Sequence, residues 1–437
     1  MKNKHLIVIS VDAMVYEDLE YARTLPSFGK IIENGAIIEK VRTIYPSLTH
    51  PVHASIITGA PAGRTGIISN ARFCPGNLSA PWFNFLGEIK CDTLFHAAKR
   101  AGLTTAASTW PVTAKGGDVI DYLVPGIMND YYIGRENDDP LDVFRDYGAP
   151  DELLEIIGEA IKRFGKEDRH PEYDEVQAYI SAEIIKKFKP NILFTHPGYV
   201  DNARHRTGLF TDEVKHSIKE TDRWIGMLLD AVHEAGIEDT TDIIVLSDHG
   251  QLSITRTIAL NALLLERGYI KANENGEIES WDAYATSCGL SAQINISRPD
   301  DKELYDSVYK TLCEMRDDGI YGFSRVLKTE EANGLYGLDG DFSFVIETDD
   351  YTSFSEDWRR PLVRRLNPID YRFGRGTHGH SPEKGPQPPF IGMGPSFKKG
   401  ALIENGHILN HAPTIARIMD LELWDCEGEA VKEILND

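Results

Sequence analysis

Short apolar runs alternate with amphipathic helical patterns along most of the chain. Runs rich in β-branched residues predict strands at 6–11, 36–46, 103–109, 192–197, 241–246 and 388–397. Apolar positions at helical spacing predict helices at 25–34, 53–59, 93–102, 172–187, 212–234 and 411–421. Strands that alternate with helices in this way are typical of a mostly parallel sheet sandwiched by helices, so we expect an α/β fold.

The pattern changes between residues 260 and 371. Glycine and aspartate become more frequent there, and 291–297 and 341–348 alternate like half-buried strands. We therefore expect an inserted α+β cap at 261–370 and a catalytic core formed by 1–260 and 371–437. A second insertion is expected within about 73–150, because 73–86 and 126–149 are rich in Pro, Gly, Asp and aromatic residues.

The composition narrows the class of protein. Apolar residues make up 41% of the 437 residues, which supports a packed core. The formal net charge is −22, which disfavours binding to nucleic acid polymers or to an anionic membrane, although bound divalent cations can reverse the field in one pocket. Five widely spaced cysteines indicate reduced thiols. With no signal-peptide pattern and no membrane-length apolar run, we expect a cytoplasmic protein.

Side chains that bind metals follow several of the predicted strands. Sites in open parallel sheets form at the carboxyl ends of the strands, and zinc favours imidazole nitrogen and carboxylate oxygen. Asp201 and His205 are four residues apart, a spacing that places both on one face of a helical turn. The predicted metal ligands of this kind are Asp12, Asp201, His205, Asp248, His249 and His378.

The side chain of Thr49 places a hydroxyl group between a predicted strand and a predicted helix. Thr49 precedes a helix that is predicted to begin after Pro51. A hydroxyl there can cap the helix, or it can act as a nucleophile once a metal removes its proton. Backbone N–H groups at a helix start also suit a developing anionic oxygen.

These segments resemble the nucleotide pyrophosphatase/phosphodiesterase branch of the alkaline phosphatase superfamily. The resemblance rests on the order of six motifs and covers roughly 1–70, 190–260 and 370–437. The motifs are the first strand with Asp12, P-S-x-T-x-P-x-H-x-S-x-x-T-G at 46–59, RTGIISN at 64–70, D-x-x-x-H at 201–205, S-D-H-G at 247–250 and G-T-H-G at 376–379.

The resemblance implies a hydrolase with two divalent metal ions. It assigns Asp12, Thr49, Asp248 and His249 to the ion that activates the nucleophile, and Asp201, His205 and His378 to the second. Zn²⁺ is expected, with Mn²⁺ or Fe as alternatives. Asn70, with the backbone N–H of His50, would stabilise the non-bridging phosphoryl oxygens. Thr49 would form a covalent phospho-threonine ester that water then cleaves.

The positions that choose the substrate depart from the family pattern. Nucleotide-cleaving members stack the base between two aromatic side chains, and here those positions hold His50 and His196, with Tyr199 as a further aromatic nearby. The expected partner is a small phosphate- or phosphonate-containing substrate, and a phosphonoacetate-hydrolase-like activity stays open beside the phosphodiesterase.

Three other functions are possible for a chain with these motifs. A sulfatase would need a Cys-x-Pro-x-Arg motif, which Cys74 does not begin. A phosphomutase and a non-catalytic metal-binding homologue are further alternatives, although all seven ligand and nucleophile positions are filled. We expect His53 to pack or to support the site rather than bind metal, and Lys115, Arg204 and Arg206 to be solvated charges.

Overall fold

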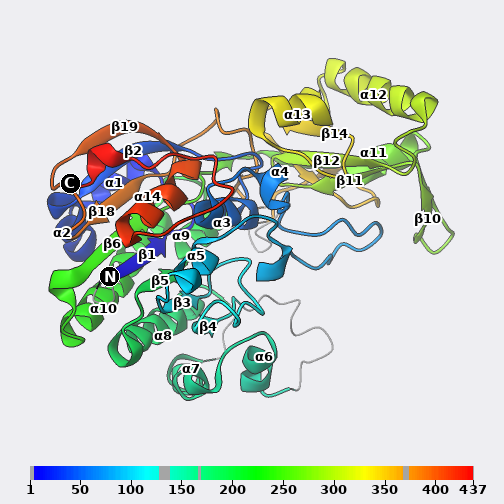
Figure 1. The fold of residues 1–437 in the computed structure, drawn as a ribbon. Helices are drawn as coiled ribbons and strands as arrows, with labels where there is room; N and C mark the ends of the chain where they lie inside the picture. The colour runs from blue at the N-terminus through cyan, green and yellow to red at the C-terminus, as the bar shows by residue number, and fades with distance from the viewer. Residues whose placement is uncertain (1–3, 127–137, 166–168, 368–373, 437) are drawn as a thin grey trace.

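A computed structural model describes residues 4–126, 138–165, 169–367 and 374–436. Its centre is an eight-stranded sheet (Figure 1). In spatial order the strands are β19 (Leu402–His407), β2 (Ala36–Arg42), β18 (Phe390–Met393), β6 (Thr241–Leu246), β1 (His5–Ser10), β5 (Ile192–Thr195), β3 (Thr105–Ser108) and β4 (Tyr122–Val124). Every pairing is parallel except those of β18, which runs antiparallel to both neighbours. The predicted α/β class is confirmed.

Strand alternation divides the apolar side chains between two cores. Leu6 and Val8 of β1 face one core, and Ile7 and Ile9 face the other. Helices α3 (Thr49–Thr58), α4 (Ala62–Thr65), α5 (Leu94–Arg100) and α14 (His411–Met419) cover the first core. The second is covered by α1 (Leu19–Ala22), α2 (Pro26–Asn34), α7 (Asp151–Phe164), α8 (Glu172–Phe188), α9 (Tyr199–Thr207) and α10 (Asp212–Glu234).

Residues within the predicted cap build a third core, which extends to one side of the layered body (Figure 1). It packs against an antiparallel sheet of β11 (Ala283–Ser287), β12 (Ser291–Ile296), β14 (Phe344–Thr348) and β13 (Phe323–Lys328). The helices here are α11 (Leu260–Glu266), α12 (Lys302–Asp317) and α13 (Thr329–Tyr336). Smaller pairings join β9 (Ile270–Ala272) to β10 (Ile278–Trp281), and β8 (Arg256–Ala259) to β15 (Thr352–Ser355) and β16 (Val363–Arg364). The predicted end of the cap at 370 lies outside the described residues.

The two segments that suggested the second insertion, 73–86 and 126–149, contain little regular structure where they are described, whereas α5, β3 and β4 between them belong to the central sheet and its covering helices. Helix α6 (Pro140–Asp146) lies in the second segment, and residues 127–137 lie outside the described part of the chain. A short pair, β7 (Leu252–Ser253) with β17 (Gly376–Thr377), joins the loop after β6 to the segment that carries His378. All five cysteines are free thiols, as expected. Among the described helices, none has both the length and the apolar character needed to cross a lipid bilayer.

Candidate active site

Three parallel strands bring distant segments to one edge of the sheet. β1 lies between β5 and β6 in register, so all three end side by side. Asp12 follows β1, His196 follows β5 directly, and Asp248 and His249 follow β6. The backbone N–H of Asp12 donates to the carbonyl of Pro197 at 3.0 Å, which ties the first two loops together.

The first group of ligand atoms comes from Asp12, Asp248 and His249, whose side chains are all buried. His249 Nε2 lies 3.2 Å from Asp248 Oδ2 and 3.6 Å from Asp12 Oδ1. The hydroxyl of Thr49 lies 3.4 Å from the same nitrogen. The backbone N–H of Ala13 donates to Asp248 Oδ1 at 3.1 Å, so the other oxygen of Asp248 is the one directed at the group.

The second group comes from Asp201, His205 and His378. Asp201 Oδ2 lies 3.2 Å from His205 Nε2, and Asp201 Oδ1 lies 3.8 Å from His378 Nε2. Each imidazole donates its Nδ1–H to a backbone carbonyl, His205 to Gly376 at 2.7 Å and His378 to Ser47 at 3.0 Å. That bond fixes the ring and turns the Nε2 lone pair toward the group.

The two groups are direct neighbours. The rings of His249 and His378 stack with centroids 3.8 Å apart and planes at 15°. Gln251 supports the arrangement, because its amide donates to both Asp201 Oδ1 (2.6 Å) and the Asp201 carbonyl (3.2 Å). The seven predicted ligand positions therefore converge on one place in the fold.

Helix α3 begins at Thr49 itself, at least three residues before the predicted start, which lay after Pro51. Pro51 is tolerated because it lies in the first turn, where its missing N–H would have no helical partner. Thr49 thus sits at the first helical position, partly exposed, above ligands that are almost fully buried. A partly exposed hydroxyl over buried ligands is the geometry that a nucleophile needs.

Asn70 is held by the first turn of α3. The backbone N–H of His50 donates to Asn70 Oδ1 at 2.9 Å. This N–H group is therefore engaged with Asn70 rather than open to a substrate oxygen, which differs from the expectation that both would act as donors. Because Oδ1 of Asn70 accepts this bond, the NH₂ group is the part of the side chain that can donate to another acceptor.

The residues predicted to contact substrate lie in three different settings. The buried ring of His50 packs edge-on against Trp82, with centroids 4.9 Å apart. His196 turns toward the first group, with Nε2 3.2 Å from Asp12 Oδ2. Tyr199 is buried among Ala178 and Trp224, and its hydroxyl donates to Glu213 at 3.0 Å. Of the three, His196 approaches the first group of ligand atoms, whereas Tyr199 packs against Trp224 of α10.

Burial dominates the electrostatics of both groups. It raises the pKa of Asp248 to about 7 and, together with the charge of Asp248, raises the pKa of Asp12 well above its ordinary value. Burial also lowers the pKa of His378 and of His196 to about 4. Burial opposes ionisation of Asp201 as well, but the neighbouring imidazole of His205 lowers the pKa of Asp201 overall.

These features fit divalent cations. Neutral imidazole and ionised carboxylate are the metal-binding forms, and three carboxylates this close and this buried need a positive counter-charge. Two buried oxygens in the first group, Asp12 Oδ1 and Asp248 Oδ2, make no hydrogen bond within the described structure. Asp12, Thr49, Asp248 and His249 could hold one ion, and Asp201, His205 and His378 a second.

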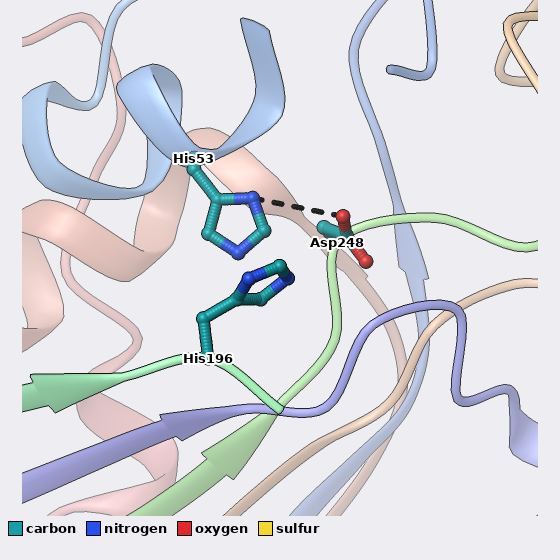
Figure 2. A group of neighbouring side chains, drawn as sticks. All are labelled: His53, His196 and Asp248. Carbon is teal, nitrogen blue, oxygen red and sulfur yellow. Dashed lines mark ion pairs between the residues drawn. The ribbon is translucent and has the colours of Figure 1, made fainter. Parts of the chain in front are cut away.

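Three features of the site were not anticipated from the sequence. His53, His196 and Asp248 form a further group of neighbouring ligand atoms (Figure 2). Gln251 follows the S-D-H-G motif directly, but no pattern in the sequence pointed to its contact with Asp201. Arg204 is buried, not solvated as predicted, because its guanidinium forms an ion pair with Asp18.

Comparison with known proteins gives a coherent set of relatives. The sequence profile of the family described as type I phosphodiesterase / nucleotide pyrophosphatase matches residues 6–378. Ectonucleotide pyrophosphatase/phosphodiesterase family member 1 of Mus musculus is 24% identical over 417 residues, which cover 91% of this chain and 39% of the mouse protein. An uncharacterized pyrophosphatase/phosphodiesterase of Schizosaccharomyces pombe is 25% identical over 253 residues, covering 56% of this chain and 44% of the yeast protein. The chain thus spans about two fifths of the length of these curated relatives.

Solved structures share the fold. Murine ectonucleotide pyrophosphatase / phosphodiesterase 5 superposes with a TM-score of 0.65 at 20% identity, covering 99% of this chain and 100% of the other. A second structure of that murine protein, at 19% identity, is described as inactive through a threonine-to-alanine substitution and as a complex with AMP. The expected alkaline-phosphatase-like fold is confirmed by this similarity.

Proposed function

Because the chain belongs to the type I phosphodiesterase / nucleotide pyrophosphatase family, we propose that it hydrolyses a phosphoric ester with Thr49 as the nucleophile. The observation that carries the proposal is the placement of the Thr49 hydroxyl, 3.4 Å from His249 Nε2 at the edge of two neighbouring ligand groups. The inactive threonine-to-alanine variant of the murine relative supports a threonine in this role.

Two divalent cations, Zn²⁺ or alternatively Mn²⁺ or Fe, would lower the pKa of the attacking hydroxyl and neutralise charge on the reacting phosphoryl group. Asp12, Asp248 and His249 would hold the ion beside Thr49, and Asp201, His205 and His378 the other. The pairing of each Nδ1–H with a backbone carbonyl keeps His205 and His378 in the binding tautomer.

The reaction consists of two displacements at phosphorus. The Thr49 hydroxyl loses its proton to solvent, its oxygen forms a bond to phosphorus, and the bond from phosphorus to the leaving-group oxygen breaks, so that the leaving group departs as an anion that takes up a proton from solvent. Asn70, fixed by the N–H of His50, donates its side-chain NH₂ to a non-bridging oxygen. Water then attacks the phospho-threonine ester, which restores the Thr49 hydroxyl and releases the phosphate product.

The setting of His50 and His196 bears on the substrate. His50 contacts Trp82 and His196 approaches Asp12, and neither position holds the stronger aromatic side chain that stacks on a base in nucleotide-cleaving members. This supports a phosphodiester whose organic groups are not clamped between two such aromatic side chains. A phosphonate such as phosphonoacetate is the second candidate, because the threonine nucleophile and the two ligand groups do not by themselves distinguish a P–O from a P–C leaving group.

A rate comparison tests the proposal. Purified protein with added Zn²⁺ or Mn²⁺ is assayed on a nitrophenyl phosphomonoester, a nitrophenyl thymidine phosphodiester and phosphonoacetate. We expect the phosphodiester to give the highest kcat/KM, and a leading rate on phosphonoacetate would establish the second candidate instead. No turnover of any of the three with either metal would contradict the hydrolase.

A further inference from the structure

His196 stands at the metal-facing edge of the sheet although no motif marks it as a ligand. It follows β5 directly, and its Nε2 lies 3.2 Å from Asp12 Oδ2. The ring packs edge-on against His53, with centroids 4.2 Å apart, and both lie beside Asp248 (Figure 2). Nε2 of His196 is buried and makes no hydrogen bond within the described structure.

His53 belongs to the same group but has no nitrogen left for a metal. Its Nδ1–H donates to the carbonyl of Thr49 at 2.7 Å, and its Nε2 accepts from the hydroxyl of Ser10 at 2.9 Å. Its 3.6 Å approach to Asp248 is too long for a hydrogen bond. A third metal held by His53, His196 and Asp248 is therefore excluded, and His196 and Asp248 are left as the atoms with open lone pairs.

A ring nitrogen of His196 lies within 4.8 Å of a carboxylate oxygen of Asp248, and its Nε2 lies 3.2 Å from Asp12 Oδ2. Two ligands of a tetrahedral zinc ion at the usual bond lengths lie about 3.3 Å apart. Asp12 and His196 are 3.2 Å apart, Asp248 and His249 are 3.2 Å apart, and His249 lies 3.4 Å from Thr49 and 3.6 Å from Asp12. Asp12 presents one oxygen to His249 and the other to His196, so it lies between the two imidazoles.

We infer that His196 is a further ligand of the ion held by Asp12, Asp248 and His249. This inference rests on the proposed function, since it requires a cation in the first group. It gives His196 a metal-binding place where the family pattern has a base-stacking side chain. It also gives the ion four protein ligands besides Thr49, so the ion stays bound while the Thr49 oxygen is esterified.

The test measures metal binding rather than turnover. Full-length protein is loaded with Co²⁺, its visible spectrum is recorded, and the two dissociation constants are measured by competition with a chromophoric chelator. In His196→Ala and His196→Gln we expect the ion of the first group to bind at least about 100-fold more weakly, since loss of mere supporting contacts already costs 10- to 100-fold. The second ion should change by less than about threefold, and the absorption per Co²⁺ should change as the first ion loses a ligand.

His411→Ala is the matched control. His411 is also a buried imidazole with an unpartnered Nε2, but it is the first residue of α14, packs against Phe390 and belongs to neither ligand group. Its loss opens a similar cavity and should leave both dissociation constants and the spectrum unchanged. If the His196 variants do not fold, ¹¹³Cd-loaded wild-type protein with ¹⁵N-labelled histidine decides the question, because four imidazoles should then show ¹¹³Cd–¹⁵N coupling.

Two outcomes overturn the inference. One is an unchanged spectrum in the folded His196 variants, with the affinity for the first ion weakened by less than about 100-fold, which would make His196 only a hydrogen-bond donor to Asp12. The other is ¹¹³Cd coupling to three imidazoles. Asp12→Asn separates these failures from a failure of the proposed function. If wild-type protein binds two ions and Asp12→Asn loses one, the two-metal account stands; if wild-type protein binds no ion at the first group, both fail.

Discussion

Replacing Asp18 with asparagine should destabilise the protein and loosen the metal site at the same time. Arg204 lies on α9 between Asp201 and His205, and its guanidinium is 1% exposed. It donates to the Asp18 carboxylate, to the Leu209 carbonyl and, at 3.0 Å, to the carbonyl of Ala13, the residue after Asp12. The contacts of Arg204 thus hold α9, which carries Asp201 and His205, against the segment that follows Asp12.

The size of the effect follows from burial. Asp18→Asn leaves a buried guanidinium with neutral acceptors only, and breaking a buried pair from one side costs about 3–5 kcal/mol. The entropy of unfolding of a 437-residue chain is about 0.9 kcal/mol/K at the usual value per residue. If core and cap unfold together, the melting temperature of the metal-free protein should fall by about 3–5 °C.

The assay is differential scanning calorimetry of metal-free and zinc-loaded protein. Asp306→Asn serves as the control, because the Lys302–Asp306 pair has the same kind of charge contact on an exposed helix, with its side chains 87% and 62% exposed. It should shift Tm by less than about 1 °C. An Asp18→Asn variant that melts within a degree of wild type and binds both ions normally would refute the reasoning.

Four further results are expected. Thr49→Ala should abolish turnover while both ions stay bound, and substantial residual hydrolysis in that variant would remove the nucleophile assignment. Elemental analysis of protein purified without chelator should find two divalent ions per chain, and one or none would count against the double site. The carboxylate of Glu347, in β14, accepts a hydrogen bond at 3.0 Å from the backbone N–H of Ser381, three residues after His378. Glu347→Ala should therefore weaken binding of the ion in the second group by about 10- to 100-fold. Unchanged zinc affinity would show that this contact does not position the ligand. Burial opposes the charged form of His170, but the carboxylate of Asp174 raises the pKa of His170 above its ordinary value. The His170–Asp174 pair therefore stabilises the fold below about pH 6.5, and this stabilisation is lost as pH rises through the folded-state pKa. The Tm difference between wild type and His170→Asn should therefore shrink from pH 6 to pH 9, and a difference that grows would contradict the assignment.

The fold was predictable because local pattern and topology agree. The alternation of apolar runs and amphipathic helices predicts the α/β layers. The segments that carry the ligands follow parallel strands, and the ends of neighbouring parallel strands lie side by side. The direction of β18 was not predictable, since a short apolar run reads the same in a parallel or antiparallel strand. The start of α3 was placed at least three residues late because the helix was expected to begin only after Pro51, although the first turn tolerates proline.

The direction of individual side chains was harder to predict than their grouping. His196 and Tyr199 are three residues apart in a loop–helix junction, yet one turns toward Asp12 and the other packs under α10. That choice is made by tertiary contacts, including the bond from Asp12 to the Pro197 carbonyl, which no local pattern encodes. Arg204 illustrates the same limit, because its charge suggested solvent whereas Asp18, distant in sequence, keeps it inside.

The proposed mechanism depends on a covalent bond between the Thr49 oxygen and phosphorus. Zinc-loaded protein mixed with a nitrophenyl phosphodiester is quenched in acid within milliseconds to seconds, digested, and examined by mass spectrometry. We predict that the peptide containing Thr49 gains the mass of the phosphoryl ester, that the adduct maps to Thr49, and that Thr49→Ala shows none. Steady turnover of the substrate by wild-type protein with an unmodified Thr49 peptide at every quench time would contradict the mechanism.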